Sequence, residues 1–260
     1  MRVRAISTHS RTAGAPRYTA CVPKPIVILR AGDAAAPVAE RRGQFAEWIV
    51  RVAGSEWQGD WRTHDVRTDE PLPPIPSASA FVITGSSNSV TERAPWMLRL
   101  EELVRSVAAS PVPLFGICFG HQIVAQALGG EVAKNPRGRE IGTVRVRRVA
   151  DDPMLDHAPA DFDVNATHVD AVVRLPAGAR VLAASELDPT QAFAIGDTVR
   201  CVQFHPEIDG DAMRGYVTAR AHLIEAEGGD PRAILARSVD APHAEGILRA
   251  FVRRFVARTE

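Results

Sequence analysis

The sequence predicts an α/β protein, a three-layer sandwich in which helices cover both faces of a mostly parallel, twisted central sheet. Three short apolar runs, at residues 25–30, 80–84 and 112–117, have the length and composition of buried strands. A stretch with apolar residues at helical spacing follows each run. Strands that alternate with helices along a chain are typical of a parallel sheet, because parallel neighbours need a long crossover connection.

The remaining elements are predicted from helical and alternating apolar patterns. Helices are expected at 38–52, at 95–109, from 119 to the Gly129-Gly130 stop, at 210–225 and at 244–258. Further strands are expected at 61–66, 143–149, 162–166, 180–184, 192–195 and 199–204. Four prolines between residues 71 and 79 predict a loop.

Composition narrows the class of protein. The 260 residues fit one large α/β domain or two small ones. The 31 basic and 31 acidic residues balance, so nothing indicates a nucleic-acid or membrane partner. No apolar run approaches the ~18 residues of a membrane span, and three cysteines cannot form a full disulfide framework. A reduced, cytoplasmic setting is therefore expected.

Residues 1–23 are polar and show little periodicity. They are expected to form a disordered extension, and a start codon placed too early is one alternative. Four arginines without an acidic residue leave a transit peptide as a second alternative. Residues 24–260 are expected to form one domain that ends in a helical tail.

The strand predicted at 112–117 leads into Gly116-Ile117-Cys118-Phe119-Gly120, which has the glycine-x-nucleophile-x-glycine pattern of a nucleophile elbow. In such an elbow the nucleophile lies on a strained turn between a buried strand and a helix. Glycine suits both flanking positions because a Cβ there would crowd the turn. The helix that begins after Cys118 lowers the pKa of its thiol, which favours the nucleophilic thiolate.

A base and a carboxylate occur far down the chain, at His205-Pro206-Glu207. Residues two apart in an extended segment point the same way, so Glu207 can orient one ring nitrogen while the other faces Cys118. His168 and Asp170 have the same spacing, so His168 is a second candidate for the base. Cys201 lies in a predicted strand and is expected to be a small buried residue.

Two motifs, Gly-Ile-Cys-Phe-Gly-His-Gln at 116–122 and Gln-Phe-His-Pro-Glu at 203–207, together resemble the class I (triad) glutamine amidotransferases. The likeness is to the glutaminase domain of GMP synthase and to its free-standing relatives, and it extends from about residue 26 to residue 207. The resemblance implies a flavodoxin-like fold with an antiparallel flap beside the parallel sheet. It also favours His205 over His168 as the base.

The resemblance further implies roles for residues around the nucleophile. Gly85 or Ser86, in a loop after a predicted strand, would supply one backbone N–H of an oxyanion hole, and the elbow gives the second donor as Phe119. Gln122 would brace the site. Two segments are similar to the family's substrate-binding stretches, and their candidate residues are Glu140, Gly142, His168 and Asp170. Without the resemblance, the segment at 131–142 could be a hairpin turn and the other segment an ordinary strand.

These residues imply a hydrolase of the glutamine side-chain amide, with a γ-glutamyl thioester between two steps. No cofactor or metal is expected. The sequence has neither a Ser-Gly-Gly-x-Asp-Ser pyrophosphatase loop nor a Gly-x-x-x-x-Gly-Lys phosphate loop, so ammonia would be released or passed to a separate synthase subunit. Two alternatives stay open: a hydrolase of another γ-glutamyl amide or peptide, and a catalytically idle regulatory or binding subunit. These patterns do not predict the oligomeric state.

Overall fold

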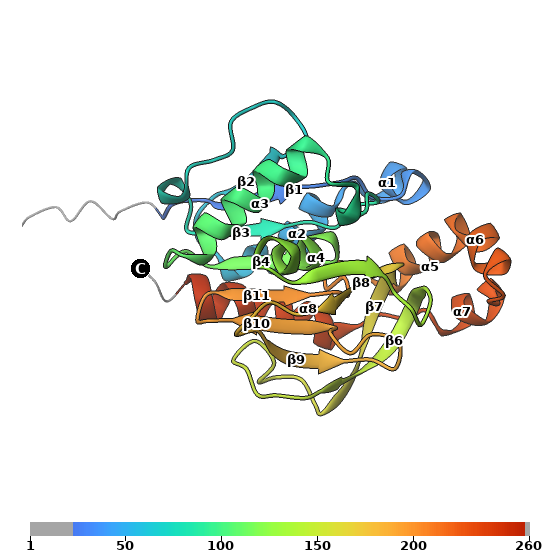
Figure 1. The fold of residues 1–260 in the computed structure, drawn as a ribbon. Coiled ribbons are helices and arrows are strands. Elements are labelled where there is room, and N and C mark those ends of the chain that lie inside the picture. The colour runs from blue at the N-terminus through green and yellow to red at the C-terminus, as the bar shows by residue number, and fades with distance from the viewer. Residues whose placement is uncertain (1–22, 258–260) are drawn as a thin grey trace, which may run out of the picture.

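The computed structural model describes residues 23–257, which form a nine-stranded sheet with helices on both faces and a smaller two-stranded sheet (Figure 1). The large sheet has the strand order β2-β1-β3-β4-β11-β10-β9-β6-β7. Its strands are Ile26–Arg30 (β1), Trp61–Asp65 (β2), Ala80–Ile83 (β3), Leu114–Ile117 (β4), Glu140–Arg148 (β6), Asp161–His168 (β7), Arg180–Ala184 (β9), Ala192–Ile195 (β10) and Val199–Val202 (β11). The small sheet pairs Glu131–Lys134 (β5) with Asp170–Arg174 (β8).

The large sheet has a parallel half and an antiparallel half. Strands β2, β1, β3, β4 and β11 are parallel neighbours, as the alternation of strands and helices predicts. Strands β10, β9, β6 and β7 pair antiparallel and continue the same sheet. The antiparallel segment is therefore an extension of the central sheet, and β5 with β8 packs separately against α4 (Phe119–Ala127).

Side chains of the parallel strands alternate between two apolar layers, which confirms the predicted three-layer arrangement. Ile26 and Ile28 of β1 pack in one layer with α2 (Phe45–Ala53) and α8 (Pro242–Phe251). Val27 and Leu29 pack in the other layer with α3 (Pro95–Ala108) and α4. The helices of both layers are seen in Figure 1 on either side of the strands.

A third apolar cluster contains Ile141 of β6 and side chains from five helices. These are α2 together with α1 (Ala36–Arg42), α5 (Gly210–Ala219), α6 (Ala221–Ala226) and α7 (Pro231–Arg237), and α5, α6 and α7 lie toward the ends of β6 and β7 in Figure 1. Tyr216 of α5 is buried in this cluster, and its hydroxyl accepts the Ala35 N–H at 3.2 Å. The cluster thereby brings a helix from the end of the chain against the loop that follows β1.

Two predicted helices are interrupted. The helix expected at 38–52 is α1 followed by α2, because Gly43 adopts a φ of 81° that a continuous helix cannot contain. The helix expected at 210–225 is α5 and α6, which meet at Arg220 with φ −108° and ψ 9°. The hairpin turn left open as an alternative at 131–142 is not formed, because β5 pairs with β8 while β6 pairs with β7 and β9.

Short helical turns also occur between and after the main elements. Three 3₁₀ turns lie at Gly54–Glu56, Ile75–Ser77 and Val90–Glu92, and a π-helical turn at Val252–Val256 follows α8. The extension predicted at 1–23 lies outside the described residues, apart from Pro23. None of the helices in the described part of the chain is long and apolar enough to cross a bilayer.

Candidate active site

Cys118 lies at the turn between β4 and α4 with backbone angles that few residues adopt. Its φ is 51° and its ψ is −101°, a strained combination for a residue with a side chain. A Cβ on Gly116 would lie 2.6 Å from the carbonyl oxygen of Gly120, and a Cβ on Gly120 would lie 2.5 Å from that of Ile83. Both glycines are therefore required, and the backbone has the geometry predicted for a nucleophile elbow.

His205 meets Cys118 because β11 and β4 are parallel neighbours whose carboxyl ends share one edge of the sheet. Val202, at the end of β11, pairs with Ile117 and accepts the Cys118 N–H at 2.9 Å. Three residues later, the imidazole of His205 hydrogen-bonds the Cys118 side chain. Nδ1 of the same ring donates to Oε1 of Glu207 at 2.7 Å. The structure therefore brings the three predicted triad side chains together, and all three are buried.

The charges of these groups favour a thiolate–imidazolium pair. Burial disfavours a thiolate at Cys118, but the charge and hydrogen bond of His205 outweigh burial and lower the pKa of the thiol below its usual value. Burial likewise disfavours the imidazolium of His205, whereas the negative charges of Glu207 and Cys118 raise its pKa to about 10. At Cys201 burial dominates and raises the pKa of the thiol. Of these two cysteines, only Cys118 has surroundings that favour a nucleophile.

Three backbone N–H groups next to Cys118 are free to bind an anion. Those of Gly85, Ser86 and Phe119 donate to no other group in the described part of the chain. A Cβ added to Gly85 would lie 2.7 Å from Cε1 of His205 and 3.7 Å from Cβ of Cys118, so this loop is close to the reactive groups. Phe119 begins α4, where helix N–H groups lack intrahelical acceptors. That the N–H groups of Gly85, Ser86 and Phe119 form an oxyanion hole stays a prediction.

Gln122 links three segments around the nucleophile. Its side-chain amide donates to the carbonyl oxygen of Asp170 at 2.9 Å and to Oε1 of Gln203 at 3.0 Å. The residue thus ties α4 to β8 and to the segment that precedes His205. This geometry is consistent with the bracing role predicted for Gln122.

Of the other four predicted substrate residues, Glu140, His168 and Asp170 are joined by hydrogen bonds outside the cavity that contains Cys118. His168 donates through Nε2 to Glu140 at 3.0 Å and through Nδ1 to the carbonyl oxygen of Asp170 at 2.9 Å. Gly142 has a φ of 107°, and a Cβ there would lie 2.6 Å from the side chain of Ile234 in α7. Glu140, Gly142, His168 and Asp170 do not line the cavity that contains Cys118. Their contact with substrate therefore stays a prediction.

A cavity of about 240 Å³ lies over Cys118 and His205. Its walls are the loop after β1 (residues 33–36), the loop after β3, and side chains from α2, β7 and α5. Pockets for drug-sized ligands usually measure about 300–1,000 Å³, so this volume suits a small substrate. In the described part of the chain, no three His, Cys, Asp or Glu side chains are grouped to hold a metal ion.

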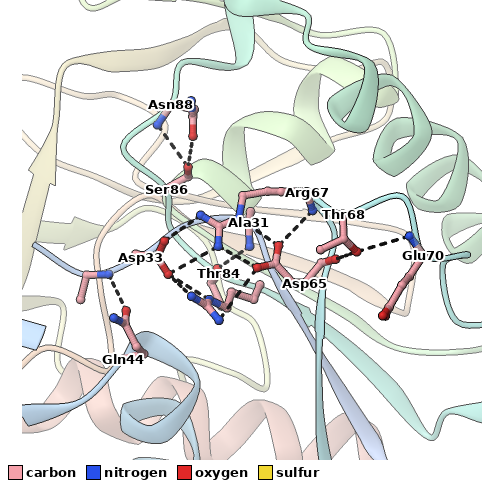
Figure 2. Close-up of polar contacts among 12 residues, drawn as sticks. Ala31, Asp33, Gln44, Asp65, Arg67, Thr68, Glu70, Thr84, Ser86 and Asn88 are labelled. Carbon is pink, nitrogen blue, oxygen red and sulfur yellow. Dashed lines mark hydrogen bonds and ion pairs between the residues drawn. The ribbon is translucent and has the colours of Figure 1, made fainter.

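A polar network fixes the loop after β1 against neighbouring strands (Figure 2). Thr84 accepts the Ala31 N–H at 3.0 Å. Asp33, at the cavity wall, accepts from Arg67 at 2.8 Å, and Arg67 also pairs with Asp65 of β2 at 2.7 Å. Hydrogen bonding to Arg67 lowers the pKa of Asp33, so this carboxylate is ionised and already paired.

Three residues that no motif indicates also shape the site. Phe45 stacks on the ring of His205 with centroids 5.7 Å apart and planes inclined by 19°. The carbonyl oxygen of Asn165 accepts the His205 N–H at 2.8 Å. Arg220 lines the cavity. In the sequence Phe45 fits an ordinary core-facing helical pattern and nothing distinguishes Arg220 from other arginines, so only the tertiary structure assembles them.

Comparison with known proteins assigns the chain to a family. A family profile described as glutamine amidotransferase class-I matches residues 50–222, more than half of the chain. The chain therefore belongs to the class I glutamine amidotransferase family, which confirms the resemblance drawn from the two motifs. Members of this family are hydrolytic enzymes.

Individual relatives support the same fold and family. Gamma-glutamyl peptidase 4 of Arabidopsis thaliana is 33% identical over 183 residues, which cover 67% of this chain and 73% of that protein. The glutamine-hydrolyzing GMP synthase of Thermomicrobium roseum is 39% identical over 156 residues, which cover 60% of this chain but only 28% of the synthase. The crystal structure of a glutamine amidotransferase from Thermotoga maritima matches with a TM-score of 0.72 and 25% identity, over 89% of this chain and 98% of that chain.

Proposed function

We propose that this protein hydrolyses the side-chain amide of glutamine, or of a related γ-glutamyl amide, through a thioester on Cys118. The observation that carries the proposal is the hydrogen-bonded series from Cys118 through His205 to Glu207, at a strained elbow beside a small cavity. A nucleophile, a base in contact with it and a carboxylate that orients the base form the constellation of a covalent hydrolase. Membership of a hydrolytic family supports the same reaction class.

In the first half-reaction the Cys118 thiolate attacks the amide carbon, and the carbonyl oxygen takes up the negative charge. The backbone N–H groups of Phe119 and of Gly85 or Ser86 stabilise that oxyanion. The imidazolium of His205 then gives its proton to the leaving nitrogen. The C–N bond breaks, ammonia or an amine departs, and a γ-glutamyl thioester remains on the sulfur.

In the second half-reaction neutral His205 takes a proton from water as the water oxygen attacks the thioester carbon. The C–S bond breaks, glutamate leaves, and the thiolate is restored beside the imidazolium. One water molecule is consumed in each cycle. Glu207 holds the ring through Nδ1, so that the other nitrogen is free to move the proton in both half-reactions.

A γ-glutamyl peptide is the second substrate class that we propose. The alignment with gamma-glutamyl peptidase 4 covers 73% of that protein, whereas the alignment with GMP synthase covers 28% of the synthase. The likeness to the peptidase thus extends over most of a protein whose name gives a γ-glutamyl substrate. Delivery of ammonia to a separate synthase subunit is a further proposal that rests on the GMP synthase relatives alone.

Incubation of the purified protein with glutamine and a panel of γ-glutamyl amides and peptides tests the proposal through release of glutamate and of ammonia or amine. We expect Cys118→Ala to lower turnover on the order of 10⁶-fold, as loss of a covalent nucleophile does. Cys201→Ala is the matched control, and its turnover should equal that of the wild type. Absence of hydrolysis across the panel, with no labelling of Cys118 by a glutamine-analogue chloroketone, would favour an idle regulatory subunit.

A further inference from the structure

Arg220 is a half-buried cation in the cavity wall with no acidic partner. Its guanidinium donates to Oγ1 of Thr167 at 3.2 Å and lies over the ring of Tyr216, 4.8 Å from the centroid. No carboxylate in the described part of the chain pairs with it. Burial lowers the pKa of Arg220, and the charge of Arg139 acts in the same direction. A guanidinium still keeps its proton at neutral pH, so a positive charge faces this cavity.

Two other arginines with largely buried side chains are paired with carboxylates. Arg200 is 5% exposed and lies 3.0 Å from Asp152, and Arg139 lies 2.8 Å from Glu227. Pairing is the usual arrangement because removal of a charge from water costs free energy unless a counter-charge compensates. The lack of a partner at Arg220 therefore indicates that the counter-charge comes from a ligand.

The cavity itself offers no anion for Arg220 other than the nucleophile. Asp33 is the only acidic residue on the described cavity wall, and it is already bonded to Arg30 and Arg67. Cys118 lines the same cavity as Arg220, and the two side chains interact through their charges. A bound group that spans the cavity from the sulfur to the guanidinium would therefore carry its reactive carbon at one end and a negative charge at the other.

We propose that Arg220 binds a carboxylate of the substrate in this cavity. The planar guanidinium can hold a carboxylate through two parallel hydrogen bonds, and its stacking on Tyr216 fixes its orientation. This assignment rests on the proposed function, and two carboxylates fit it. One is the α-carboxylate of the γ-glutamyl group, and the other is the carboxylate of an amino acid that leaves from a γ-glutamyl peptide.

Steady-state kinetics with three substrates show which of these two carboxylates Arg220 binds. Glutamine, γ-glutamylmethylamide and γ-glutamylglycine all contain the α-carboxylate, but only γ-glutamylglycine has one on the leaving group. For Arg220→Met we expect KM to rise on the order of 10- to 100-fold, the size of a lost charge-assisted hydrogen bond. A rise for all three substrates identifies the α-carboxylate, and a rise for γ-glutamylglycine alone identifies the leaving group. Unchanged KM values for all three would overturn the proposal.

Arg220→Lys and Arg214→Met are the companion variants. The lysine keeps the charge without the planar fork, so its KM should lie between those of the wild type and Arg220→Met. Arg214 lies on α5, is exposed and donates to the Ser238 carbonyl oxygen at 2.9 Å. Its loss should leave KM unchanged. A rise in KM as large for Arg214→Met as for Arg220→Met would contradict a carboxylate site at Arg220.

Alkylation of Cys118 tests the site without turnover. Iodoacetate carries a carboxylate and iodoacetamide does not, and mass spectrometry of the Cys118 peptide measures both rates. For Arg220→Met we expect the iodoacetate rate to fall by about 10-fold, with the iodoacetamide rate within about 2-fold of the wild type. An equal fall for both reagents would show a structural role through Tyr216 and overturn the proposal. If no substrate is hydrolysed and the iodoacetate preference persists, the proposed function fails while the anion site stands.

Discussion

Two histidines near the nucleophile are each followed two residues later by an acid, yet their hydrogen bonds give them different chemistry. His205 uses Nδ1 for Glu207, at 2.7 Å, and keeps the other nitrogen for the thiol. His168 uses both nitrogens as donors, to the carbonyl oxygen of Asp170 at 2.9 Å and to Glu140 at 3.0 Å. Neither of these acceptors is a nucleophile, and His168 does not line the cavity over Cys118, so neither nitrogen of His168 can exchange a proton with a substrate there. The spacing is the same, but only His205 has a nitrogen available for proton transfer.

The second histidine acts as a fixed buried charge. Burial disfavours its imidazolium, but the hydrogen bond to Glu140 and the charge of Asp188 raise the pKa of His168 above its usual value. That charge also adds to the lowering of the Cys118 pKa, after the larger contribution of His205. The comparison therefore favours His205 for the proposed proton transfer and a structural role for His168.

Replacement of His205 should have the largest effect on activity. We expect His205→Asn to lower kcat by about 10²–10⁴-fold, because general acid–base transfer by the ring is lost in both half-reactions. Because His205→Asn also leaves the carboxylate of Glu207 buried without its cation, the free energy of unfolding should fall as well, so kcat is measured on protein that circular dichroism shows to be folded. A kcat equal to that of the wild type would show that another group moves the proton.

Replacement of His168 should instead affect stability first. His168→Asn leaves Glu140 buried without its cation, and loss of one partner of a buried pair costs about 3–5 kcal/mol in the free energy of unfolding. Because the pKa of His168 is raised, its stabilising effect is full below the ordinary pKa of about 6.5 and is lost as pH rises through the raised value. Denaturant unfolding at several pH values measures both. If the folded variant loses as much kcat as His205→Asn does, the distinction between the two histidines is wrong.

The pH dependence of Cys118 alkylation tests the difference between His205 and His168. In the wild type the rate with iodoacetamide should fall only as pH drops through the lowered pKa of Cys118. The imidazolium of His205 should persist until pH rises through about 10. In His205→Asn only the smaller effect of the His168 charge still opposes burial, so the alkylation curve should move to higher pH, toward or above the ordinary thiol pKa of about 8.5. His168→Asn should move the curve less, and an equal displacement for both variants would contradict the assignment.

The parts of the site that the sequence predicts are those with local constraints. Gly116 and Gly120 lie within two residues of Cys118, so one short motif contains the whole elbow. The contact between Cys118 and His205 follows from a parallel sheet, which brings the carboxyl ends of β4 and β11 to one edge. Sequence reasoning therefore predicted the contact between Cys118 and His205 without coordinates.

The parts that the sequence does not predict depend on register and packing. Glu140 meets His168 because the two residues are direct cross-strand partners in β6 and β7, and no local pattern encodes that register. The helix break at Gly43 is hidden because apolar spacing continues on both sides of it. Arg220 becomes a cavity residue only through the packing of α5 against α1.

The smallest effect that we expect comes from the aromatic ring that stacks on His205 and has no counterpart at His168. Phe45 and His205 have centroids 5.7 Å apart and an interplanar angle of 19°, and such a contact contributes about 0.5–1.5 kcal/mol beyond burial. Phe45→Leu should therefore lower kcat by about 2- to 10-fold, because the ring of His205 gains freedom to leave the productive orientation. Steady-state kinetics and thermal unfolding on the same preparation measure the effect.

The chain contains a matched control for Phe45. Phe255 stacks on Phe251 with the same centroid distance, 5.7 Å, and the same angle, 19°, at a site away from the cavity. Phe255→Leu should lower stability by about 1 kcal/mol and leave kcat unchanged. If both variants lower kcat equally, the effect of Phe45 is a general loss of packing, and His205 does not depend on its aromatic neighbour for orientation. A change in kcat confined to Phe45→Leu would instead add Phe45 to the residues that position His205.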